Sequence, residues 1–228
     1  MIKIHNDVVQ GSDEWHAMRC GIITASSMKH LLTPALKWAA NEKQKAHFYE
    51  ILAQRITKFV EPSYISDDML RGQEDEIEAR LLYAKTYGPV TEVGFITNDN
   101  LGFVIGYSPD GLVGDDGLIE CKSRSMKHQM RTIIDHALED KIDPDYMLQV
   151  QTGLLVSERK WCDLVSYCGG LPMVTVRVFP DPVIQAAIVE VSQVFEEDMA
   201  IAITKYETLI AGGRRAIPTV RKIEEQMI

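Results

Sequence analysis

The stretch "SPDGLVGDDGLIECKS" (residues 108–123) decides the fold of this chain. Its apolar residues alternate with acids and a lysine at the spacing of a β-strand, and the acidic, glycine-rich run "VGDDG" (113–117) marks a turn between two strands. Burying a charged side chain costs several kcal/mol unless the charge is paired or bound to a metal. The hairpin therefore carries either a structural ion network or a functional site.

The spacing within this hairpin brings its charged side chains together. Asp110 and Glu120 are ten positions apart across the turn, so two adjacent strands can place both carboxylates near each other. Glu120 and Lys122 share one face of a strand, whereas the side chain of Cys121 points away and its carbonyl can lie beside the carboxylates. Two carboxylates and a carbonyl are hard oxygen ligands suited to Mg²⁺ or Mn²⁺. Lys122 can then hold or deprotonate the attacking water, because burial and nearby cations lower its pKa.

A structural interpretation of the same residues is an ion pair between Glu120 and Lys122 on a half-exposed strand, with Asp110 in a turn. A lone E-x-K has little specificity, but here Pro109-Asp110 precedes it by ten residues and strand signals flank both parts. This is the P-D…(D/E)-x-K pattern of metal-dependent nucleases. Glu76, in the acidic run "GQEDEIEARLLY" (72–83), is a further candidate ligand, since two metals can clamp the attacking and leaving oxygens of phosphoryl transfer. Most acids of that run are expected to form a solvated face.

Hydrophobic periodicity predicts helices before and after this hairpin. "TASSMKHLL" (24–32) reads as a short helix capped by Thr24, and 41–60 reads as a longer one. Residues 66–88 predict another helix, broken near Gly72, with Ile77, Leu81, Leu82 and Lys85 on its apolar face. Further helices are expected over 125–140, 144–157 and 181–211.

Short β-branched segments predict the strands. The blocks 91–98, 102–109 and 117–123 read as an antiparallel meander, and 160–168 and 173–179 read as two more strands. The order predicts an α/β (α+β) fold, with a mixed central β-sheet flanked by helices. We expect one domain over 1–228, with a core of about 13–180, a C-terminal helix over about 181–211 and a basic tail.

Composition narrows the function classes. The net charge of −9, from 33 acids against 24 lysines and arginines, repels nucleic acid on average, so DNA binding requires a local basic site. One dense basic patch begins at the hairpin, and it consists of Lys122, Arg124, Lys127, His128 and Arg131. The four cysteines form no C-x-x-C pair, which argues against structural zinc and against a disulfide framework. No membrane-length apolar run and no signal-peptide pattern is visible, so a cytoplasmic location, or the host cytoplasm for a phage protein, is expected.

Five ordered blocks resemble one known family. They are "EWHAMRCGIITASS" (14–27), "GQEDEIEARLLY" (72–83), "SPDGL" (108–112), "IECKS" (119–123) and "YMLQVQTGLLV" (146–156). Together they resemble the phage lambda-type alkaline exonucleases of the PD-(D/E)xK superfamily. The resemblance implies a restriction-endonuclease-like core, a ring-shaped homotrimer, and Mg²⁺-dependent 5′–3′ digestion of one strand of linear double-stranded DNA to mononucleotides. It also implies two ions per site, with Mn²⁺ as a substitute, and a single-strand annealing protein as partner in phage recombination.

The resemblance also implies roles for individual residues. Asp110, Glu120 and Lys122 correspond to catalytic residues, and the metal ligands correspond to Glu76, Asp110, Glu120 and the carbonyl of Cys121. The residues of a 5′-phosphate pocket correspond to Arg19, Ser26, Ser108 and Gln151. Linear DNA with 5′-phosphorylated ends is then the preferred substrate. From the residues alone, Arg19 reads as a surface arginine, Ser26 as a helix cap, and Gln149 and Gln151 as polar residues of an amphipathic helix. Met69 and Leu70 are candidates for an apolar wedge between the DNA strands, or for ordinary helix core.

Two other functions fit the same motif. One is another nuclease with this core, a restriction-type endonuclease or a junction resolvase, which would not depend on a 5′-phosphorylated end. The other is a non-catalytic DNA-binding scaffold with a decayed site. The complete set of Asp110, Glu120 and Lys122 argues against the scaffold.

Overall fold

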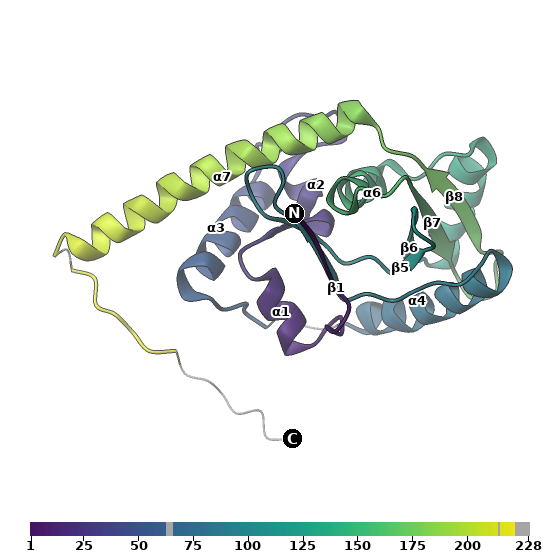
Figure 1. Cartoon of the computed structure of the whole chain (residues 1–228), viewed down its shortest axis with the longest axis horizontal. Coiled ribbons are helices and arrows are strands. Elements are labelled where there is room, and N and C mark those ends of the chain that lie inside the picture. Colours follow the sequence, from purple (N-terminus) through teal and green to yellow (C-terminus); the bar gives the residue numbers. More distant parts are fainter. Residues whose placement is uncertain (63–65, 214, 222–228) are drawn as a thin grey trace, which may run out of the picture.

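The computed structural model describes residues 1–62, 66–213 and 215–221, which form two four-stranded sheets with helices packed around and between them (Figure 1). The strands are β1 (Ile2–His5), β2 (Ile23–Thr24), β3 (Phe95–Asn98), β4 (Ile105–Tyr107), β5 (Gly111–Val113), β6 (Gly117–Ser123), β7 (Trp161–Tyr167) and β8 (Val174–Val178). The α-helices are α1 (Asp13–Arg19), α2 (Met28–Leu31), α3 (Glu42–Thr57), α4 (Asp67–Thr86), α5 (Met126–Arg131), α6 (Pro144–Ser157) and α7 (Pro182–Ala211). Three short turns of other helical types are Ala25–Ser27, Thr132–His136 and Ala137–Glu139.

Both sheets are mixed. The first has the order β1-β3-β4-β2, in which β3 is antiparallel to β1 and β4, and β2 is parallel to β4. The second has the order β5-β6-β7-β8, in which β6 is antiparallel to β5 and parallel to β7, and β8 is antiparallel to β7. Gly111 of β5 pairs with Ile119 of β6, so Asp110, one residue before β5, lies beside the Glu120–Lys122 part of β6.

Helix α6 packs in the centre of the molecule against strands of both sheets and against α2 and α7. Asp143 caps its N-terminus and Pro144 occupies its first turn, a combination that fixes where the helix begins. Its buried side chains join the main hydrophobic core, and they include Leu148, Val150, Leu154 and Val156. Gly153 allows the close approach, because a Cβ there would lie 2.8 Å from the ring of Tyr107.

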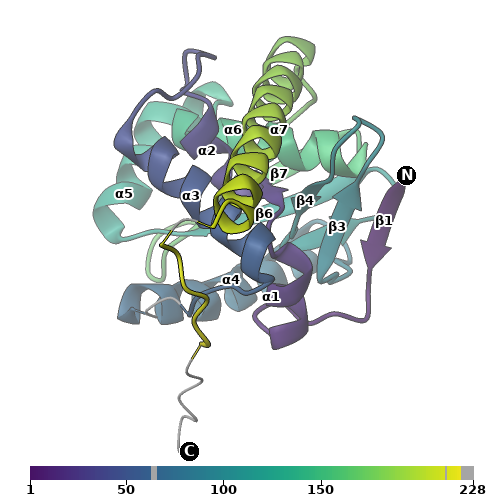
Figure 2. The same cartoon turned by 90° about the vertical axis from the view of Figure 1, so that its left-hand side faces the viewer.

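Helix α4 covers one face of the second sheet (Figure 2). Its buried residues Ala79 and Tyr83 pack against Ile119, Cys121 and Val165 of β6 and β7. The hydroxyl of Tyr83 donates a 2.6 Å hydrogen bond to the buried carboxylate of Asp163, and Arg177 donates to the same carboxylate. This network fixes α4 over β6, so that a residue on the inner side of the helix can face the hairpin.

Most of the predicted elements are confirmed. The helices predicted over 41–60, 144–157 and 181–211 are α3, α6 and α7, and Thr24 caps the short helical segment before α2. The strand blocks 160–168 and 173–179 are β7 and β8. The mixed α/β class is therefore confirmed, although the central sheet is divided into two. None of the helices in the described ranges is long and apolar enough to cross a bilayer.

Two predictions about α4 are wrong. The helix is continuous through Gly72, with no break there. The predicted apolar face is solvent-exposed, since Ile77, Leu81 and Leu82 are 50%, 61% and 42% exposed. The buried face is instead set by Tyr83, whose hydroxyl has a partner in Asp163, so the helix turns its aromatic and alanine side toward the sheet.

The strand predictions also need correction around the hairpin. The blocks predicted as one meander divide between the sheets, because β4 pairs in parallel with β2 while the chain from Asp110 onward joins the second sheet. The predicted helix 125–140 consists of α5, a π-helical turn and a 3₁₀ turn. The pairings of β1 and β2 were not predicted, since a two-residue strand such as β2 has no periodicity of its own.

Two glycines provide a test of this packing. A Cβ at Gly72 would meet no atom within 4 Å, so Gly72→Ala should raise the free energy of unfolding by about 0.5–1 kcal/mol through better helix propensity. A Cβ at Gly106 would lie 2.2 Å from the ring of Phe95, so Gly106→Ala should lower it by about 1–3 kcal/mol. Urea denaturation measures both. A destabilised Gly72→Ala variant would contradict a continuous α4.

Candidate active site

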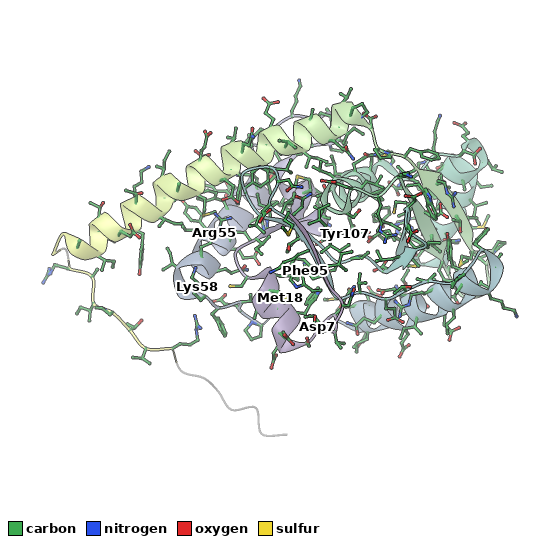
Figure 3. All side chains as sticks on the ribbon, in the orientation of Figure 1. Asp7, Met18, Arg55, Lys58, Phe95 and Tyr107 are labelled. Carbon is green, nitrogen blue, oxygen red and sulfur yellow. The ribbon has the colours of Figure 1, made fainter. Side chains whose placement is uncertain are left out.

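Two carboxylates of the hairpin lie buried side by side. Asp110 is 8% exposed and Glu120 is 2% exposed. The backbone N–H of Cys121 donates to Oδ2 of Asp110, which ties the residue before β5 to β6. Oε2 of Glu120 accepts a 2.7 Å hydrogen bond from the hydroxyl of Tyr107, a fully buried side chain near the centre of the molecule (Figure 3).

Lys122 and Gln149 hold the other oxygen of Glu120. Nζ of Lys122 lies 2.7 Å from Oε1 of Glu120 and 3.1 Å from Oε1 of Gln149. The Gln149 amide nitrogen donates to the same Glu120 oxygen, so the three side chains form a closed triangle. The lysine also lies 5.2 Å from the centre of the Tyr146 ring. Helix α6 thus supplies two side chains that orient the catalytic candidates of β6.

Helix α4 contributes Glu76 through an arginine bridge. Arg80, one turn after Glu76, donates from Nη1 to the Glu76 carboxylate at 3.2 Å and to the backbone carbonyl of Asp110 at 3.3 Å. Its Nη2 lies 3.0 Å from the carboxylate of Glu92. Arg80 therefore fixes the distance between the helix and the loop that carries Asp110.

Burial and mutual repulsion dominate the electrostatics of these acids. Burial first, and then the charges of Glu120 and Glu76, hold the pKa of Asp110 well above its usual value. Burial raises the pKa of Glu76, although Arg80 opposes this. Glu120 is paired with Lys122 and Glu76 with Arg80, but in the described ranges no lysine or arginine is within ion-pair distance of Asp110.

The pKa of Lys122 differs from the expectation. Burial lowers it, but the carboxylates of Glu120 and Asp110 raise it by more, so the net direction is upward. The protein groups alone therefore keep the lysine charged. The predicted downward shift requires that other positive charges neutralise the two carboxylates.

The residues present fit divalent cations in their donor chemistry. Burial is the main cause of the raised pKa values of Asp110 and Glu76, and the charge of Glu120 adds to both; a cation relieves this repulsion. In the described part of the chain, no three His, Cys, Asp or Glu side chains already converge on one ion-sized point. Glu76 is instead turned to Arg80, and Glu120 to Lys122 and Gln149. These charge-neutralising contacts must be exchanged when an ion binds.

A cationic pocket lies two residues before Asp110. Nη1 of Arg19 donates to the hydroxyl of Ser108 at 3.1 Å, and Nη2 lies 3.5 Å from the hydroxyl of Ser26. The indole of Trp15 donates to Ser108 at 2.9 Å, and its ring lies 4.1 Å from the guanidinium carbon of Arg19. Burial lowers the pKa of Arg19 to about 10. Across the described residues, no carboxylate pairs with this arginine, so the pocket is suited to an anion.

The structure places the other predicted residues as follows. Gln151 does not join the Arg19 pocket: its amide nitrogen donates to the carbonyl of Phe179, and its oxygen accepts from the N–H of Asp181. The side chain of Cys121 packs under α4, as the strand parity predicts. Met69 and Leu70 are each 49% exposed, so the helix-core interpretation is wrong.

An open groove leads to the acids. Its volume is about 980 Å³, and it runs between the N-terminal segment with α1, the α3–α4 connection and α4. Trp15, Met69, Glu76, Arg80 and Asp110 all line it. Leu70 is not among the lining residues.

The predicted basic patch is partly a structural network. Arg124 is bonded to Asp143 at 2.9 Å, to the hydroxyl of Tyr146 and to Thr132, so it anchors the start of α6. Lys127, His128 and Arg131 remain exposed on α5. The patch is therefore sparser than the sequence indicated.

Four residues of the site were not predicted as functional: Tyr107, Gln149, Trp15 and Arg80. Gln149 and Gln151 are two positions apart on a helix, so they point in different directions, and only the packing of α6 shows which one reaches Lys122. Arg80 had a usable signal, since it lies one helical turn from Glu76.

Comparison with known proteins identifies the class. The structure matches that of LHK-Exo, an alkaline exonuclease from Laribacter hongkongensis, with a TM-score of 0.77, 32% identity, and coverage of 88% of this chain and 99% of that one. LHK-Exo in complex with dAMP matches with a TM-score of 0.76, 33% identity, and coverage of 88% and 98%. A phage related exonuclease from Haemophilus somnus 129PT shares the fold, with a TM-score of 0.56, 14% identity, and coverage of 81% and 96%. No curated protein matches.

These two mixed sheets, with paired acids and a lysine on one hairpin, define a restriction-endonuclease-like fold of the alkaline exonuclease type. A family model described as the YqaJ-like viral recombinase domain matches residues 14–160. The chain belongs to the YqaJ-like viral recombinase family, and the resemblance that the five sequence blocks indicated is confirmed.

Asp110→Asn tests the repulsion within the site. The pKa of Asp110 in the folded state lies above its unfolded value of about 4, so the charged form favours unfolding. The contribution of Asp110 to the free energy of unfolding is therefore complete at low pH and is lost as the pH rises through the folded-state pKa. Asparagine can still accept from Cys121 but carries no charge. We expect its melting temperature in EDTA at pH 8 to exceed wild type by about 2–4 °C, or roughly 1 kcal/mol. The difference should shrink as the pH falls; a lower melting temperature would contradict the repulsion.

Proposed function

We propose that this chain is a divalent-metal-dependent 5′–3′ exonuclease that degrades one strand of linear double-stranded DNA to mononucleotides. The observation that carries the proposal is the tripeptide Ser108-Pro109-Asp110. Its serine belongs to the pocket of Arg19, and its aspartate belongs to the acid cluster, so an anion pocket and the hydrolytic residues are joined over two residues. A terminal phosphate bound at Arg19 places the next phosphodiester at the acids.

This spacing supports the polarity and the product. A 5′-terminal phosphate in the Arg19 pocket leaves one nucleotide between the pocket and the scissile bond, so hydrolysis releases a nucleoside monophosphate. The related LHK-Exo has been crystallised with dAMP, which is such a molecule. An endonuclease or a junction resolvase has no use for a terminal-phosphate pocket, which is why the exonuclease is preferred.

The carboxylates of Asp110, Glu120 and Glu76, with the carbonyl of Cys121, would hold two Mg²⁺ or Mn²⁺ ions. Bound ions supply positive charge to the phosphate oxygens and lower the pKa of a water molecule. Lys122 then holds the attacking water beside the phosphate, and Gln149 keeps Nζ of Lys122 in position. The hydroxyl of Tyr107 orients Glu120 from the opposite side.

Met69 extends the proposal to the unpairing of the duplex end. Met69 is exposed and lines the groove that leads to the acids. Leu70, the next residue, is equally exposed but does not line the groove. An apolar side chain here can stack on a base and offset the cost of opening one pair, about 1–3 kcal/mol. Met69, with Leu70 as its neighbour, is therefore proposed as a strand wedge.

We also propose that the chain assembles into a ring-shaped homotrimer and acts with a single-strand annealing protein. A ring-shaped homotrimer requires one surface of the chain to bind a different surface of the next copy. The exposed apolar side chains Leu81 and Leu82 of α4 are available for burial in such a contact. The 3′ single strand left by digestion would pass to a single-strand annealing protein in phage recombination, which the family membership supports.

The metal chemistry can be tested with linear duplex labelled at one 5′ end. Asp110→Ala and Glu120→Ala should abolish release of labelled mononucleotide in Mg²⁺, and wild type should be inactive in EDTA. Lys122→Ala should lower the rate by about 10²–10⁴-fold while still binding DNA with metal. Lys205→Ala removes an exposed lysine of α7 and should cut at the wild-type rate. A Lys122→Ala variant as active as Lys205→Ala would remove Lys122 from the chemistry.

The Arg19 pocket can be tested by end preference. Wild type should digest 5′-phosphorylated duplex faster than 5′-hydroxyl duplex, because a charge-assisted hydrogen bond to phosphate is worth about 1.5–3 kcal/mol. Arg19→Ala should lose about 10–100-fold on the phosphorylated end and little on the hydroxyl end. Lys205→Ala, which removes an exposed cation of α7, is the control. An unchanged ratio of the two rates in Arg19→Ala would exclude the pocket and favour an endonuclease.

A further inference from the structure

Helix α7 carries the end of the chain away from the body and then returns it. Arg55 of α3 anchors the helix through a two-pronged ion pair with Glu196, at 2.5 and 2.6 Å. Its last buried residue is Met199, and the turns that follow project into solvent (Figure 1). The helix ends at Ala211, Gly213 adopts a positive φ of 66°, and the chain then runs back toward the α3–α4 side.

The returning tail (residues 215–221) contacts the wall of the groove. The guanidinium carbon of Arg221 lies 3.5 Å from the centre of the Phe59 ring. Phe59 follows the end of α3 directly after Lys58, which Figure 3 labels, and it lines the same groove as Glu76 and Asp110. The tail therefore lies at the rim of the groove that leads to the acids.

The net charge of this segment is positive, whereas that of the whole chain is negative. The sequence "GGRRAIPTVRK" (212–222) contains four basic residues and no acid, within a chain of net charge −9. Arg215, Ile217 and Val220 are exposed, and residues 216–221 have no regular secondary structure. Within the described residues, neither Arg215 nor Arg221 is paired with a carboxylate. Arg221, held at the rim of the groove by Phe59, is therefore free to bind an anion.

The stacking geometry leaves the binding groups of Arg221 available. A guanidinium that lies over an aromatic ring uses its face for the contact, whereas its N–H donors point outward in its own plane. Phe59 thus holds the arginine without using its hydrogen bonds. These donors are arranged for a planar, two-pronged contact with a phosphate.

We propose that the tail is a DNA-binding arm, docked on Phe59 through Arg221, which contacts the phosphate backbone of the duplex at the mouth of the groove. The inference rests on the proposed nuclease function and supplies the basic track that the acidic surface otherwise lacks. Arg221 neutralises a phosphate of the duplex before its end reaches the acids. The arm contributes affinity and not chemistry, because it lies at the rim and no residue of the tail contacts the acid cluster in the described structure.

The test compares Arg221→Ala with Lys205→Ala, which removes one exposed cation from α7. Binding of 5′-phosphorylated duplex is measured by fluorescence anisotropy in Ca²⁺ over a range of salt. Arg221→Ala should weaken binding about 3–10-fold at low salt and reduce the slope of log affinity against log salt by about 1. Lys205→Ala should change neither. The rate of digestion in Mg²⁺ at saturating DNA should be unchanged in both variants.

Phe59→Leu provides a second variant, because it keeps an apolar side chain but removes the ring face that holds Arg221. With an unchanged melting temperature, it should weaken binding as Arg221→Ala does. Equal binding by Arg221→Ala and Lys205→Ala would overturn the arm, and so would faster digestion by Arg221→Ala, which would mean that the tail blocks the groove. A wild-type protein that neither binds nor digests duplex would instead overturn the proposed function, and the arm with it.

Discussion

The burial of Asp110 beside Glu120 is the constraint on which the rest of the structure depends. Burial, together with repulsion between the two carboxylates, raises the pKa of Asp110, so the buried carboxylate oxygens require donors. Those donors come from four places in the chain: the N–H of Cys121, the hydroxyl of Tyr107, the ammonium of Lys122 and the amide of Gln149. Tyr107 belongs to β4 and Gln149 to α6, so the packing of these two elements against the hairpin supplies the donors to Glu120.

The surrounding elements are positioned by this requirement. Helix α6 packs against both sheets and is anchored at its start by Arg124 and Asp143, which sets the direction of Gln149. Helix α4 is fixed by the bond from Tyr83 to Asp163, which brings Glu76 and Arg80 to the loop of Asp110. The clustered carboxylates therefore lower the stability of the fold. When metal ions replace the contacts of Arg80 with Glu76 and of Lys122 with Glu120, the relief of the repulsion between the carboxylates would favour ion binding.

The acidic surface of the chain has to be reconciled with a nucleic-acid substrate. An acidic surface excludes nucleic acid on average, and the predicted basic patch is weakened because Arg124 is committed to Asp143. Positive charge is instead located at the Arg19 pocket and at the returning tail on Phe59. In the described residues, no carboxylate forms an ion pair with Arg19. A duplex end would meet the tail first, then the groove, then the pocket.

The sequence by itself determined the hairpin, the shared face of Glu120 and Lys122, and most helix and strand positions, and the family resemblance of its five blocks indicated the candidate roles of Asp110 and Arg19. The hairpin and the element positions depend on local spacing, which periods of 2 and 3.6 residues encode. Only the tertiary structure decided which face of α4 is buried, that Gln149 and not Gln151 reaches Lys122, and that the strands form two sheets. These features depend on partners distant in sequence, such as Asp163 for Tyr83, and no local pattern encodes the identity of a distant partner.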